Sequence, residues 1–280
     1  MAQELHIRGL RHRHVEGDSY LASLSDLMVG LLFVFIIMLM AFALNYRTAT
    51  ESSAKQEKKY QQQISEEERI RQNMEEALSR LTSQNKGALA EMLHKIQQQL
   101  HTSGIEVSVS ADQSTLRIGE DTLNFTSGSW NISPAGDQVL QTIAQVLMHI
   151  VPCYAHGAPD CGKIRPILEA AFIEGSTDNV PYHNGAMDNW NLSANRAVEA
   201  YRHLITAQPG LDELRNTDNK PLFGVSGYAD RRPVAENDTD DDRKRNRRID
   251  VRFLLLAPTQ QDLDRTLLEI GAERQPSSPP

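Results

Sequence analysis

The stretch SLSDLMVGLLFVFIIMLMAFAL, residues 23–44, sets the organisation of the whole chain. From Leu27 to Leu44 it contains no charged residue, no proline and no polar side chain. Counted from Tyr20, the apolar run forms about 37 Å of helix at a rise of ~1.5 Å per residue, which is enough to cross a bilayer. We therefore expect a transmembrane helix over residues 20–45.

A cleaved signal peptide is the alternative interpretation of this run. The apolar core is longer than that of a usual signal peptide, and Asn45-Tyr46-Arg47 is a poor cleavage site, so the sequence favours a retained anchor. Arg8, Arg11 and Arg13 lie in the preceding segment 1–19, where positive charge marks the cytoplasmic side. We expect a single-pass protein of the bacterial inner membrane, with a cytoplasmic N-terminus and a periplasmic C-terminal domain.

Asp26 is the one acid within the predicted span, about 9 Å from its start at ~1.5 Å per residue. Acids inside a membrane are costly, and they are candidates for function by default. A carboxylate that is neutral among apolar groups and ionised when water reaches it is suited to carry a proton. Because one helix cannot enclose an ion path, this role requires partner helices. The alternative is an interfacial acid that reaches the surface or caps the helix together with Ser25.

The segment 46–101 has a helix-forming composition, with no proline and one glycine, Gly87. Its apolar residues recur in steps of three and four, but the register slips at Asn85-Lys86-Gly87. We expect a polar helical stalk, with a dimeric coiled coil in pieces as one form of it. A mobile, partly helical linker is the alternative for its first half.

The pattern changes after His101 to one typical of an α+β domain over residues 102–258. A hairpin is expected where GIEVSVS and STLRIG alternate apolar and polar residues. A helix capped by Ser133 follows, and a second helix capped by Ser193 or Asn191 is expected in NLSANRAVEAYRHLITA. With three further strands, this order predicts a sandwich whose helices cover one sheet face. For the segment 259–280 we expect a C-terminal helix and a disordered tail, RQPSSPP.

The two cysteines, Cys153 and Cys161, stand eight residues apart on the side that is expected to be oxidising. A local disulfide is the favoured interpretation. A metal site with His149 and His156 is the alternative, although the spacing matches no zinc pattern. We predict no bound metal or other cofactor.

Two functional classes are disfavoured by composition and spacing. The basic run RKRNRR directly follows the acidic run ENDTDDD in a chain of net charge −8, so we do not expect nucleic-acid binding. No nucleophile–base pair has a usable spacing, so we do not expect an enzyme.

Several motifs resemble known families. An aspartate near the cytoplasmic end of a single N-terminal span, in YLASLSDLMVGLLFVFIIMLMAF, looks like the B subunits of rotary ion-driven motors such as the MotB-like flagellar stator. Residues 105–256 resemble the OmpA-like peptidoglycan-binding domain. The motifs that carry this second resemblance are LNFTSGSWNISPAG, IEGSTD, NLSANRA, VSGYADRRPVAEND and NRRIDVRF.

The OmpA-like resemblance implies a site for the diaminopimelate residue of the peptidoglycan stem peptide. In that family an aspartate and an arginine bind this residue, and the matching positions are Asp178 and Arg196. Arg196 is suited to bind a carboxylate with two parallel hydrogen bonds, and Asp178 to accept from an ammonium group. Asn191 and Arg247 match further positions that line the family's pocket. Without the resemblance, each of these residues has an ordinary structural role as a cap or a surface charge.

Among the motor subunits, the sequence SLSDLMVGLLFVFIIMLM and the long stalk look closer to the B component of Zorya anti-phage defence systems than to the flagellar protein. This resemblance implies a homodimer of this chain inside a pentameric ring of MotA-like A subunits. Peptidoglycan anchors the dimer, and ion flow by way of Asp26 turns the ring. We expect the ion to be H⁺, with Na⁺ left open. A flagellar-type stator subunit and a passive OmpA-like wall tether remain the alternatives. A further alternative is that residues 45–60 form a plug that closes the ion channel.

Two segments depart from the family pattern near the expected pocket. NVPYHNGAMDNW, residues 179–190, is longer than the usual loop, and CYAHGAPDCGK precedes the central strand as an insertion. We expect both to alter ligand specificity or affinity.

Overall fold

The computed structural model describes residues 16–125, 128–157, 161, 167–185 and 187–273, and the side chains from Ser23 onward. The predicted cytoplasmic arginines and the RQPSSPP tail lie outside these residues. The chain divides into two units, Met1–Gln72 and Asn73–Pro280.

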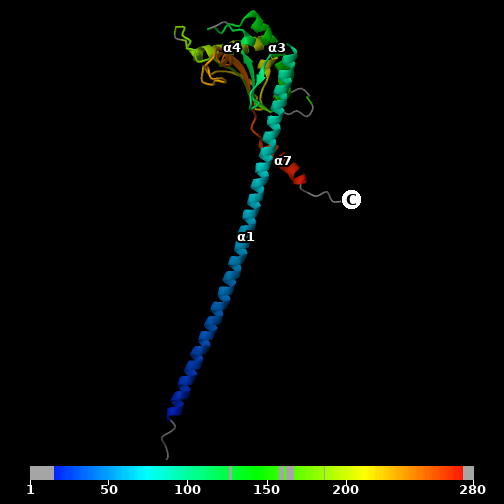
Figure 1. Cartoon of the computed structure of the whole chain (residues 1–280). Coiled ribbons are helices and arrows are strands. Elements are labelled where there is room, and N and C mark those ends of the chain that lie inside the picture. Colours follow the sequence, from blue (N-terminus) through cyan, green and yellow to red (C-terminus); the bar gives the residue numbers. More distant parts are fainter. Residues whose placement is uncertain (1–15, 126–127, 158–160, 162–166, 186, 274–280) are drawn as a thin grey trace, which may run out of the picture. The chain divides into compact units, whose positions relative to one another are not determined.

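The first unit consists of the long helix α1 (Glu16–Thr102), which also extends into the second unit (Figure 1). The helix is unbroken at Gly87, where the apolar register slips. Exposed pairs such as Arg47 with Glu51 (3.1 Å) contribute about 0.2–0.5 kcal/mol each. From Ser23 to Arg71 every side chain of α1 is exposed. The apolar stretch therefore has no packing partner among the described residues.

A five-stranded sheet forms the centre of the second unit, in the order β1-β2-β5-β3-β4. The strands are β1 (Ser108–Val109), β2 (Thr115–Gly119), β3 (Leu168–Ser176), β4 (Phe223–Gly227) and β5 (Arg248–Leu255). β3 and β4 are parallel, and the remaining neighbours are antiparallel. The predicted hairpin is confirmed as β1 and β2, and the α+β class is confirmed with it.

Two helices, α3 (Pro134–Ile150) and α4 (Asn189–Ala207), build the main core with the sheet. Ser133 caps α3 as predicted, since its hydroxyl accepts from the amide of Gly136 at 3.1 Å. The predicted cap of α4 was wrong. Asp188 caps this helix, accepting from the amides of Trp190 and Asn191, because its carboxylate reaches two free amides of the first turn.

Close approach of α4 to the sheet depends on two glycines. A Cβ atom at Gly175 in β3 would lie 2.0 Å from the carbonyl oxygen of Ser193, and one at Gly227 in β4 would lie 2.6 Å from the amide nitrogen of Ala194. No larger side chain fits there without moving the helix. The first turns of α4 are thereby held against the ends of β3 and β4.

The core also includes the C-terminal end of α1. Met92, Leu93, Ile96 and Leu100 are fully buried in the same cluster as the sheet and α3. The compact unit therefore begins at Asn73, earlier than the predicted domain limit at 102.

The remaining elements are short, apart from the last. They are α2 (Glu120–Leu123), the 3₁₀ helix η1 (Val151–Tyr154), α5 (Gly210–Glu213), α6 (Asp240–Asn246) and α7 (Gln260–Glu273). The segment for which a C-terminal helix was predicted contains α7. It is tied to α1 by an ion pair between Arg80 and Glu273 at 2.9 Å.

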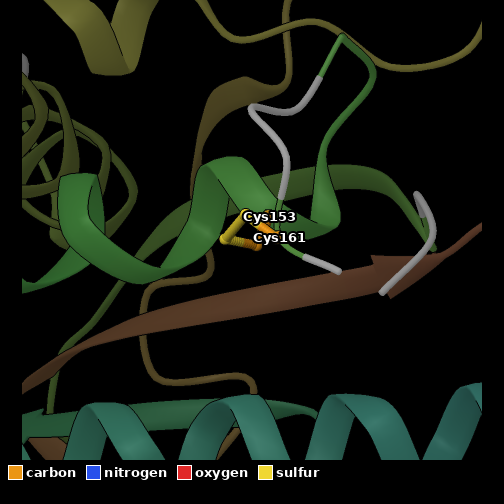
Figure 2. Close-up of a disulfide and its surroundings, with 2 residues drawn as sticks. All are labelled: Cys153 and Cys161. Atoms are coloured by element: carbon orange, nitrogen blue, oxygen red, sulfur yellow. A yellow bond between two sulfur atoms is a disulfide. The ribbon is translucent and has the colours of Figure 1, made fainter. Parts of the chain in front are cut away.

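The predicted disulfide is present between Cys153, in η1, and Cys161 (Figure 2). The Cα atoms are 5.7 Å apart, within the usual range for this bond. Both sulfurs are therefore committed to each other. Among the described residues, no group of three or more His, Cys, Asp or Glu side chains is placed to hold a metal ion.

Candidate functional site: a charged pocket at the end of β3

A pocket of about 640 Å³ opens where the end of β3 meets α2, α6 and the start of α4. Most of its exposed lining is polar, and its charged groups come from segments far apart in the sequence. The lining residues are Glu120, Asp121, Asn124, Phe125, Gly128, Thr177, Asp178, Val180, Pro181, Tyr182, Asn189, Leu192, Arg196, Asp240, Arg243 and Arg247. Three of the four predicted wall-binding residues, Asp178, Arg196 and Arg247, therefore meet in one pocket.

Asp178 lies two residues beyond β3 and is buried. Its Oδ1 accepts from the amide of Val180 at 3.0 Å, and its Oδ2 accepts from Nη1 of Arg247 at 2.5 Å. The carboxylate is thus fixed at the pocket wall by a backbone amide and a guanidinium.

Arg247 joins the two acidic walls of the pocket. Besides Asp178, its Nε donates to Oε2 of Glu120 at 2.5 Å. Burial opposes the charge of Arg247, but the hydrogen bonds to Asp178 and Glu120 outweigh it and raise the pKa of the guanidinium. Arg247 therefore stays charged and holds both carboxylates in place.

Arg196 is the most buried cation of the pocket, with 3% of its surface exposed. Its guanidinium lies over the ring of Phe125, 4.9 Å from the centroid, and its Nε donates to the carbonyl of Ser129 at 2.9 Å. Burial, helped by the charge of Arg247, lowers its pKa, although Glu120 and Asp178 oppose this. A buried cation is stabilised by an incoming anion, since pairing offsets its lost hydration.

The terminal amino groups of Arg196 are what a carboxylate ligand would use. Within the described part of the chain, no hydrogen bond occupies either of them. The stacked ring and the Ser129 carbonyl fix the plane of the guanidinium, so a ligand would meet an oriented pair of donors.

Asn191 is placed differently from the other predicted residues. Its Oδ1 accepts from the amide of Asp188 at 3.1 Å in a capping box, and Asn191 does not line the pocket. Asn189, two residues earlier, lies in the lining instead. Its amide group donates to the carbonyl of Val180 at 3.0 Å and accepts from the amide of Tyr182 at 3.0 Å.

Sequence reasoning missed Glu120, Tyr182 and Arg243. Glu120 begins α2, directly after β2, and only its contact with Arg247 marks it as part of the site. Tyr182 belongs to the longer loop, whose unusual length was the available signal. Arg243 lies in the basic run RKRNRR, from which only Arg247 was predicted as a pocket residue.

Together these groups present cations and anions within a single cavity. Arg196, Arg243 and Arg247 face Glu120, Asp121, Asp178 and Asp240. Such a mixture suits a ligand that carries both an ammonium group and a carboxylate, because each finds an opposite charge.

Asp26 lies in the other unit, on α1. It lines a shallow groove together with Ser23, Leu24, Leu27, Gly30, Leu31 and Val34. All of these side chains are exposed. α1 is also the single helix among the described residues that is long and apolar enough to cross a membrane.

No protein-family model matches the chain. Motility protein B of Bacillus subtilis (strain 168) is 39% identical to it over 83 residues, which make up 29% of this chain and 29% of that protein. The chain is similar to motility protein B. The match thus spans less than a third of that relative's length.

Three solved structures have a similar fold. A putative MotB-like protein from Desulfovibrio vulgaris covers 63% of this chain and 99% of its own, with a TM-score of 0.48 and 22% identity. The cell wall anchor of the T6SS from Pseudomonas aeruginosa covers 59% and 97%, with a TM-score of 0.42 and 23% identity. The periplasmic domain of Helicobacter pylori MotB covers 58% and 87%, with a TM-score of 0.39 and 20% identity.

Proposed function

We propose that this chain is a wall-anchored, single-span subunit of an ion-driven rotary motor in the bacterial inner membrane. The observation that carries the proposal is that one chain combines an apolar helix bearing one acid with a pocket suited to a zwitterionic peptide. The local similarity to motility protein B supports it. The N-terminus is cytoplasmic in this proposal, and the second unit is periplasmic.

The pocket binds the stem peptide of peptidoglycan in this proposal. Arg196 forms two parallel hydrogen bonds to a carboxylate of diaminopimelate, and Asp178 accepts from its ammonium group. Arg247 already forms an ion pair with Asp178. The ammonium group therefore replaces part of this ion pair, while Glu120 continues to bind Arg247. Asn191 stabilises the first turn of α4, the helix that carries Arg196.

Binding to intact sacculi tests the wall-anchoring role. Arg196→Ala should lower the fraction of full-length protein that sediments with purified sacculi by roughly tenfold, since a charged hydrogen-bonded pair contributes about 1.5–3 kcal/mol. Arg202→Ala is the matched control, because Arg202 is an exposed arginine on the same helix. Equal sedimentation of both variants would contradict the assignment. Release of soluble wall fragments would instead indicate an enzyme, which we do not propose.

Asp26 carries the ion, which we propose to be H⁺. Its exposed position on α1 leaves it accessible to partner helices, as the ion path requires. We propose a second copy of this chain and a ring of MotA-like A subunits as the source of those helices. One charge that crosses the membrane releases about 2.3 kcal/mol per 100 mV, which limits each ion to a small step.

Anti-phage defence is the biological role that we propose for this motor, and it rests on the resemblance of residues 23–40 to the B component of Zorya systems. The test is phage protection in cells that carry the whole operon with Asp26→Asn. We expect protection to be lost while the membrane level of the protein stays normal. Full protection by this variant would leave only a wall tether, and an unrelated transmembrane helix would then replace the span without loss of function.

A further inference from the structure

We propose that residues 179–185 and 187–190 form a glycan-binding rim beside the pocket. In this proposal the side chains of Val180, Met187 and Trp190 contact the sugar rings of the strand to which the stem peptide is attached. The inference rests on the proposed wall-binding function and adds a second ligand class, a polymer of amino sugars, to the same site.

Exposed apolar side chains concentrate on the rim. Among the described residues of the sheet domain 102–258, five large hydrophobic side chains are exposed. Three of them belong to the rim, namely Val180 (54% exposed), Met187 (37%) and Trp190 (48%). Single exposed hydrophobic residues are ordinary, but three within eleven residues, one of them in the pocket lining, indicate a binding surface.

Hydrogen bonds fasten the rim to the pocket. The amide group of Asn189 binds the backbone of Val180 and Tyr182, each at 3.0 Å, and so ties the start of the rim to the first turn of α4. Val180 and Tyr182 line the pocket themselves, and Trp190 follows Asn189 directly. The start of the rim is therefore part of the pocket wall.

The centre of the rim is also ordered. Backbone hydrogen bonds between Asn184 and Met187, at 3.1 and 3.2 Å, close a turn around Gly185, whose φ is +65°. The side-chain amide of Asn184 donates to the hydroxyl of Tyr182 at 3.3 Å, and a Cβ added at Gly128 would lie 3.4 Å from the Tyr182 ring. Such a surface loses little conformational freedom when it binds a ligand.

The chemistry of the rim differs from that of the pocket and matches a sugar. Its one acid, Asp188, is used as the helix cap, and the amide group of Asn189 is engaged with the backbone, while Asn179 and Asn184 supply amide groups. Aromatic faces carry partial negative charge and attract the C–H groups on the face of a sugar ring. Because the stem peptide is covalently joined to the glycan strand, a peptide in the pocket brings sugar rings to the rim.

The test compares two ligands, using full-length protein in detergent. One ligand is the free stem peptide with diaminopimelate, and the other is the same peptide joined to its disaccharide. We expect wild type to bind the disaccharide-peptide more tightly, and Trp190→Ala to weaken that binding roughly tenfold while leaving the free peptide unaffected. Trp190→Phe should retain most of the gain, because an aromatic ring remains.

Leu268→Ala is the matched control, since Leu268 is an exposed apolar residue on α7. Equal affinity for the two ligands, or no effect of Trp190→Ala, would overturn the proposal that the rim binds glycan and would leave the pocket assignment intact. Binding of neither ligand would overturn the rim together with the proposed wall-binding function. Because alanine favours helix more than tryptophan does, loss of the helix would not explain a weaker Trp190→Ala variant.

Discussion

At the scale of single residues, Arg247 determines the state of the pocket. It holds Asp178 and Glu120, whose side chains are 10% and 16% exposed, each through a 2.5 Å ion pair. Two acids at that degree of burial repel each other and need a cation between them. Arg247 is thus a positioning residue as well as part of the pocket wall.

The first prediction follows from this arrangement. Arg247→Met should lower the free energy of unfolding by about 2–4 kcal/mol, because it leaves two partly buried carboxylates without a partner. Adding Glu120→Gln should recover part of the loss by removing one of them. Urea unfolding of the single and double variants measures the coupling, and strictly additive effects would show that Arg247 does not bridge the two acids.

A second prediction concerns Asp250 in β5, on the sheet face away from the core. Its Oδ2 accepts from Arg248 at 2.9 Å, but its buried Oδ1 has no hydrogen-bond partner among the described residues. Burial raises its pKa above the usual 3.8, although Arg248 and Arg117 oppose this. The folded state therefore binds this proton more tightly than the unfolded state does.

Stability from Asp250 is consequently present at low pH and is lost as pH rises from about 3.8 through the raised pKa. Asp250→Asn does not titrate, so its stability relative to wild type should increase between about pH 4 and about pH 7. Urea unfolding of both proteins across this range is the measurement. A constant difference would mean that the pKa of Asp250 is the same in the folded and unfolded states.

Motifs predicted Asp178, Arg196 and Arg247 as site residues, and the structure places all three in the pocket. Glu120 could not be found in this way, since its partner Arg247 is 127 residues distant in sequence. The interaction that gives Glu120 a role exists only once β2 and β5 have paired.

At the scale of elements, the contact between α4 and β3 places Arg196 near Asp178. Gly175→Ala would set a Cβ 2.0 Å from the Ser193 carbonyl and push α4 away from the sheet. We predict a loss of about 1–3 kcal/mol in stability together with weaker sacculus binding. Gly271→Ala is the matched control in α7, where a Cβ meets nothing within 4 Å, and it should stabilise slightly. Normal sacculus binding by Gly175→Ala would contradict the prediction.

The elements were predictable where one local signal dominates. Ser133 followed by Pro134 marks the start of α3 without competition. At α4 several capping residues stand in a row, and the choice of Asp188 depends on how the preceding loop packs, which the sequence does not reveal. The continuity of α1 through Gly87 shows that a shift in apolar register need not end a helix.

At the scale of the whole molecule, the sheet domain depends on the end of α1. We predict that residues 73–280 fold without the rest of the chain and keep sacculus binding. A fragment of residues 103–280 lacks several fully buried side chains, among them Met92, Leu93, Ile96 and Leu100, and should lose at least about 5 kcal/mol. Urea unfolding of both fragments is the check, and equal stability would show that α1 lies outside the core.

The pairing of Arg247 with Asp178 also bears on how long the protein stays attached at one place. An incoming ammonium group must replace an ion pair that already exists, so the attachment gains only the difference between two similar interactions. Binding of this kind is selective and readily reversible. In the proposed wall-binding function, the protein would release one strand and bind another as the cell enlarges and cuts its wall, while its own fold stays intact.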